Sequence, residues 1–104
     1  MWIFCDAFLS IVRDRNDVKK LLVRSRIAGD IEKVFGSAKI SHTPRADYPF
    51  RASIDAGTVA RTIAARIEAI EYDNFKNSIS ESERCSVYST VWQMMRRAQG
   101  VWDT

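Results

Sequence analysis

The pattern of apolar and polar residues in the first part of the chain predicts β-strands. Residues 2–13 are rich in aromatic and β-branched side chains, which predict one strand or two pieces joined by a kink, with a bulge at Asp6 and Ala7. Residues 13–17 form a polar stretch of turn-forming residues, and residues 19–27 then alternate apolar and polar positions. We therefore predict an antiparallel hairpin from residues 2–13 and 19–27.

Three further segments follow this hairpin. Apolar residues at helical spacing within residues 31–35 predict a helix of two turns, which Gly36 ends. Residues 38–42 and 48–54 have the pattern of two more strands, and Pro49 favours the edge of the sheet for the second of them. The chain thus supplies four predicted strands and one short helix in its first half.

The second half of the chain has the spacing of helices. Asp55 can cap a helix that begins near Gly57, and Ser80 with Glu83 forms a capping box for a final helix that ends at about Ala98. The first of these helices carries an apolar stripe of Val59, Ile63, Ile67 and Ile70. We predict that this stripe lies on the sheet.

These elements together predict an α+β fold in the order ββαββαα. Four strands in two hairpins favour a four-stranded antiparallel sheet, with the helices on one face of it. The chain has 104 residues, of which 46% are apolar, and this size and composition suit one hydrophobic core. We therefore expect residues 1–104 to form a single domain.

Composition also argues against a membrane protein and a metalloprotein. The longest apolar runs are far shorter than the roughly 20 residues that cross a bilayer, and Asp6 interrupts the apolar start too early for a secretory signal. We expect a cytoplasmic protein with no membrane partner. Cys5 and Cys85 have no histidines at the spacing of zinc ligands, so we expect reduced, buried thiols and no metal or cofactor, with a disulfide left open.

Residues with the chemistry for catalysis are sparse. His42 is the only histidine, the four glycines are isolated rather than gathered in a phosphate-binding loop, and no nucleophile elbow occurs. A general base would also need a positioned partner and a pocket. The sequence therefore favours a protein without catalytic activity, and leaves open a small nuclease or hydrolase that uses His42 with Asp47.

Positive charge is concentrated in the first half of the chain. The net charge is +3, and residues 1–54 hold 10 basic and 6 acidic residues whereas residues 55–104 hold 6 and 7. Basic side chains on neighbouring strands would share the sheet face opposite the helices, where they can bind phosphate or carboxylate. The candidate anion-binding residues are Lys20, Arg24, Arg26, Arg45 and Arg51. The leading hypothesis is a non-enzymatic module that binds nucleic acid or a nucleoprotein complex.

Aromatic residues on the first strand can extend this basic face. Trp2, Phe4 and Phe8 are spaced to share one face, and a surface that combines aromatic and basic side chains is one on which single-stranded bases stack. The alternative is that these aromatics belong to the core and that the charges merely solvate an open sheet.

A second hypothesis is a protein-interaction module. The final helix has a broad apolar surface, and residues 72–77 place two aromatics in a polar loop, where they either bind a partner or pack onto the helix junction. The candidate interface residues are Tyr72, Phe75, Trp92, Met94 and Met95. Such a surface suits a symmetric homodimer, or a small inhibitor of the kind that phages use against bacterial defence systems.

Several segments also resemble a family of short bacterial proteins. An aromatic strand is followed by Asp-Ala-Phe-Leu-Ser-Ile-Val at residues 6–12, and the similarity extends over residues 22–26, 29–32, 46–48, 50–51 and 72–76. These blocks cover most of the chain. The family has no assigned activity, so the resemblance implies membership and no function.

Overall fold

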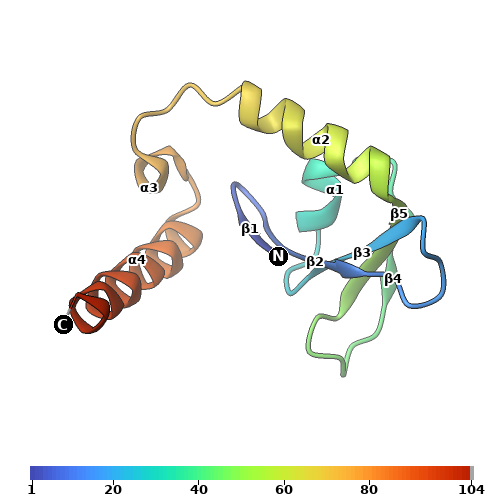
Figure 1. Ribbon diagram of the computed structural model, residues 1–104, viewed down its shortest axis with the longest axis horizontal. Coiled ribbons are helices and arrows are strands. Elements are labelled where there is room, and N and C mark those ends of the chain that lie inside the picture. Colours follow the sequence, from blue (N-terminus) through green and yellow to red (C-terminus); the bar gives the residue numbers. More distant parts are fainter. Residues whose placement is uncertain (104) are drawn as a thin grey trace. The chain divides into compact units, whose positions relative to one another are not determined.

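The fold is described by a computed structural model, which covers residues 1–103 (Figure 1). The chain divides into two compact units, of which the first is Met1–Ile70 and the second begins at Glu71. The first unit contains an open antiparallel sheet of five strands in the spatial order β1-β2-β3-β5-β4, together with helices. The predicted α+β class and antiparallel sheet are confirmed.

The sheet has one strand more than the sequence predicts. Its strands are β1 (Trp2–Phe4), β2 (Phe8–Arg13), β3 (Lys20–Ser25), β4 (Ser41–His42) and β5 (Phe50–Asp55). Residues 2–13 form two strands rather than one, and the predicted kink between them is a full reversal at Asp6, so that β1 pairs antiparallel with β2. A hydrogen bond from the Cys5 N–H to the Ala7 carbonyl, 2.9 Å long, closes this turn. The observed element order is therefore βββαββααα.

Two helices cover the sheet of the first unit. They are α1 (Asp30–Val34) and α2 (Ala56–Glu68), and Figure 1 shows both on the same side of the strands. As predicted, Asp55 caps α2, since its carboxylate accepts a hydrogen bond of 3.1 Å from the Thr58 N–H. Gly29 precedes α1 with φ of 92°, a left-handed conformation that side chains with a Cβ rarely adopt.

The core of this unit lies between the sheet and the two helices. It is built from buried residues of β2, β3 and β5 and of both helices: Leu9, Ile11, Val23, Ala52, Ile31, Val34 and Val59. The predicted stripe on α2 is only half correct. Val59 and Ile63 pack in or against this core, whereas Ile67 and Ile70 are exposed because they follow the part of α2 that lies on the sheet.

The second unit consists of α3 (Phe75–Ser78) and α4 (Ser82–Trp102). The predicted capping box is wrong, since α4 has Glu81 at its N-cap with no side-chain capping hydrogen bond, and the helix continues to Trp102. Asn74 caps α3 by accepting a hydrogen bond of 3.1 Å from the Asn77 N–H, so part of the predicted loop is helical. Among the described residues, no helix has the length and apolar character needed to cross a membrane.

Candidate functional site

The candidate site is built on the sheet face that α1 and α2 leave open. Side chains alternate between the two faces of a strand, so the neighbours of the buried Val23 and Ala52 point away from the helices. The strand register aligns one residue from each strand across this face. The row consists of Trp2, Ser10, Arg24, Arg51 and Ser41, taken in the spatial order of the strands. Strands β3 and β5 are neighbours, so Arg24 and Arg51 share this face and lie opposite each other.

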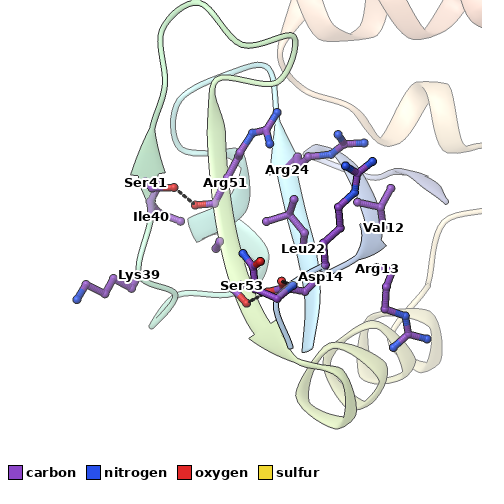
Figure 2. Close-up of a pocket in the computed structure, with 13 residues that line it drawn as sticks. Val12, Arg13, Asp14, Leu22, Arg24, Lys39, Ile40, Ser41, Arg51 and Ser53 are labelled. Atoms are coloured by element: carbon purple, nitrogen blue, oxygen red, sulfur yellow. Dashed lines mark hydrogen bonds between the residues drawn. The ribbon is translucent and has the colours of Figure 1, made fainter. Parts of the chain in front are cut away.

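The middle of this face is hollowed into a groove of about 1210 Å³, shown in Figure 2. Strands β2, β3 and β5 form its floor, and the loop after β2 and residues 39–41 form its rims. Five basic residues line it: Arg13, Arg15, Arg24, Lys39 and Arg51. Asp14 is the acidic residue of its lining. We call this hollow the basic groove.

Arg24 is held in the groove by uncharged groups. Its Nη2 donates a hydrogen bond of 2.9 Å to the Ser10 hydroxyl, and its guanidinium carbon lies 4.5 Å from the centre of the Tyr48 ring. Its Nε is buried and has no hydrogen-bond partner within the described chain. No carboxylate among the described residues pairs with Arg24, so its positive charge stays available to an anion.

Tyr48 organises three arginines on this side of the sheet. It is 4% exposed, and the guanidinium carbons of Arg24 and Arg26 lie 4.5 and 4.3 Å from its ring centre. Arg51 donates a hydrogen bond of 3.0 Å from Nε to the Tyr48 carbonyl. The Nη1 and Nη2 atoms of Arg51 take no part in this hydrogen bond. Cation–π contacts of this kind restrain arginines without neutralising them. Arg24 and Arg51 are therefore pre-positioned side by side.

The other predicted basic residues differ from this pair. Arg26 follows the end of β3 and forms an ion pair of 3.0 Å with Asp47, and donating this hydrogen bond raises the pKa of Arg26. Lys20 lies at the far end of β3, opposite Asp55, and Arg45 is exposed in the loop between β4 and β5. Of the five candidates, only Arg24 and Arg51 line the basic groove.

Sequence reasoning missed the rim residues of the groove. Arg15 and Lys39 lie outside the strands, where side-chain direction does not follow from alternation. It also missed Asp14, whose carboxylate accepts hydrogen bonds from the Ser53 hydroxyl and from the Asn16 N–H. The hydrogen bond from Ser53 is the main cause that lowers the pKa of Asp14.

An aromatic cluster adjoins the arginine row on the same face. The ring centroids of Trp2 and Phe8 are 6.0 Å apart in an edge-on arrangement, and those of Phe4 and Phe8 are 4.8 Å apart. Phe4 and Phe8 are half-buried, while Trp2 is 66% exposed. The alternative that these aromatics belong to the core is therefore wrong for Trp2.

The residues considered for catalysis or metal binding lie outside the lining of the basic groove. His42 stacks on Phe50 with ring centroids 4.6 Å apart, and Asp47 binds Arg26. Cys5 and Cys85 are free and half-buried, and burial raises the pKa of the Cys5 thiol. Within residues 1–103, no group of three or more His, Cys, Asp or Glu residues is placed to hold a metal ion.

The candidate interface residues lie in the second unit. Phe75 packs between Tyr72 and Tyr88, with ring centroids 5.8 and 5.6 Å apart, so the aromatics of the loop anchor it to α4. The Lys76 ammonium lies 4.4 Å from the Trp92 ring centre. Met94 and Met95, also on α4, are more than half exposed.

No known protein family, curated protein or solved structure matches the chain. The family resemblance, which begins at residues 6–12, therefore stays a prediction.

Proposed function

We propose that the chain is a non-enzymatic binding module that engages single-stranded nucleic acid, alone or within a nucleoprotein complex, through the open face of its sheet. The observation that carries the proposal is the row of residues in register across the strands, which places two arginines that form no ion pair with the described residues on the same face as an exposed tryptophan. Phosphate and base are the two groups that this combination of side chains binds.

The arginine pair suits a phosphate. Arg24 and Arg51 lie directly opposite each other on neighbouring strands, whose backbones are roughly 5 Å apart, so both guanidinium groups can reach one phosphate. Arg15 and Lys39 on the groove rims add positive charge on either side. With five basic residues and one acidic residue in its lining, the basic groove should attract a polyanion and lose this attraction as salt rises.

The aromatic cluster suits a base. Trp2 lies two strands away from Arg24, a separation of roughly 10 Å, so a base stacked on Trp2 and a phosphate held by the arginines can belong to one short segment of a strand. Stacking on an aromatic ring requires an unpaired base, because the faces of paired bases are covered by their neighbours in a duplex. The proposal therefore names single strands as the ligand.

Fluorescence anisotropy with labelled single-stranded DNA and RNA, repeated over a series of salt concentrations, tests the proposal. Arg51→Ala removes a charged donor and should weaken binding about tenfold, with the slope of log K against log salt falling by about 0.7. Trp2→Ala should cost about 1–3 kcal/mol in binding free energy and leave the salt slope nearly unchanged.

Arg61→Ala is the matched control, because Arg61 is exposed on α2 and its loss removes the same charge from outside the groove. It should change affinity little. A duplex of the same sequence should bind more weakly than the single strand. The proposal fails if the single strand does not bind, or if the combined Arg24→Ala and Arg51→Ala variant, folded by circular dichroism, binds as well as the original protein.

A further inference from the structure

Within the second unit, helix α4 presents an apolar surface that α3 leaves uncovered. The helix has 21 residues, which corresponds to a length of roughly 30 Å, yet Arg84 and Tyr88 are its buried residues. Apolar residues recur along it at alternating intervals of four and three: Tyr88, Val91, Met95, Ala98 and Trp102. This is the spacing by which one helix packs along another. Met95 and Trp102 are more than half exposed.

A second apolar row widens this surface on one side. Val87, Met94 and Val101 are spaced by seven residues and lie next to the first row, and all three are more than half exposed. On the other side of the first row, the Trp92 ring of α4 is covered by the side chains of Lys76 and Arg96. A partner helix can therefore approach α4 over the side that carries Met94.

Charges along this open side identify the partner. Glu83 and Arg97 flank the row of Val87 and Met94 at the two ends of the surface and lie two heptads apart. Neither residue forms an ion pair with another described residue. A second copy of α4 in antiparallel orientation would bring each Glu83 to the Arg97 of the other copy, whereas in a parallel pair the two residues would lie two heptads apart along the axis and could not meet.

We propose that α4 is a self-association surface, which pairs with α4 of a second copy of this chain in antiparallel orientation. The pair is centred near Thr90, packs Val87, Val91 and Met94 of the two copies together, and forms two symmetric ion pairs between Glu83 and Arg97. A two-fold axis through the centre makes the contact closed, so association stops at the dimer. Burial of the methionine and valine side chains supplies the attraction, and the charges set the orientation.

Sedimentation equilibrium over a wide range of protein concentration tests this proposal. The full chain should dimerise reversibly, and Met94→Glu should make it monomeric without loss of helix by circular dichroism, because Met94 is exposed within the chain. Gln99→Glu adds the same charge at an exposed position on the side of α4 that carries Trp92 and is the matched control, which should still dimerise.

The orientation is tested by exchanging charges. Glu83→Arg and Arg97→Glu should each weaken dimerisation about tenfold, and the combined variant should restore it. A chain that stays monomeric at every concentration, or binds only a different protein through α4, overturns self-association. A dimer that the combined variant does not restore overturns the antiparallel pairing. Neither result bears on oligonucleotide binding, which depends on the first unit.

Discussion

At the scale of single residues, Asp14 is the acidic residue in the lining of the basic groove. Titration of its carboxylate tests the hydrogen bond that it accepts from the Ser53 hydroxyl. The hydrogen bond from Ser53 keeps the pKa of Asp14 below the ordinary value of 3.8, with help from the Asn16 N–H. Ser53→Ala should therefore raise the pKa of Asp14 part of the way to that value. A carbon NMR titration of the side-chain carboxylate measures the change. Ser41→Ala, which removes a hydroxyl bound to the Arg51 carbonyl, should leave the titration unchanged.

The lowered pKa of Asp14 also makes the stability of the fold depend on pH. The pKa of Asp14 is lower in the folded than in the unfolded chain. Its ionised carboxylate therefore stabilises the fold fully when the pH is above the pKa of the unfolded chain, and this stabilisation is lost as the pH falls through the pKa of the folded chain. Ser53→Ala should thus lower the unfolding free energy at neutral pH and have a smaller effect in strong acid. An equal effect at both pH values would contradict the assigned hydrogen bond.

The sequence predicted part of the groove at this scale. Strand alternation, together with the assumption that the two strands are neighbours, placed Arg24 and Arg51 on one face, because both lie in regular strands. Pairing of Arg26 with Asp47 depends on how the loop before β5 folds back, and no local pattern reports that. Arg15 and Lys39 could not be assigned for a similar reason, since turn residues have no fixed face.

At the scale of elements, the turn between β1 and β2 depends on α1. The buried Asp30 carboxylate accepts a hydrogen bond of 2.9 Å from the Phe8 N–H. Asp30→Ala leaves that donor without its partner and should lower the unfolding free energy by about 1–3 kcal/mol, measured by urea denaturation. Asp30→Asn keeps an acceptor oxygen and should cost less. Glu32→Ala, at an exposed position of the same helix, is the control, and an equal loss there would refute the role of Asp30.

This dependence explains why the sequence did not reveal the fifth strand. Asp6 is the only residue of 5–7 that favours tight turns, and without glycine, proline or asparagine beside it the segment predicted a kink rather than a full reversal. The reversal is held by partners that are distant in the chain, since Asp6 forms an ion pair of 2.7 Å with Arg66 and Phe8 bonds to Asp30. Segments with strong local signals, such as the helix after Asp55, were located correctly.

At the scale of the whole molecule, burial is distributed unevenly between the two units. The main cluster of buried apolar residues comes entirely from the first unit, from Ala7 to Val59. The second unit buries little more than Ile79, Arg84 and Tyr88, and leaves most of α4 exposed. An isolated amphipathic helix is marginal in water, so the proposed pairing of α4 with a second copy would add to the stability of this helix.

Because the main buried cluster lies within the first unit, we expect that unit to fold without the second. A fragment of residues 1–70 tests this expectation. The fragment retains the whole sheet, α1, α2 and every residue of the basic groove. We expect it to unfold cooperatively in urea, to bind single-stranded oligonucleotides with the affinity of one full-length copy, and to stay monomeric in sedimentation because it lacks α4. A fragment that fails to fold would instead support the single domain predicted over residues 1–104. A folded fragment that still dimerises would show that self-association uses the sheet rather than α4.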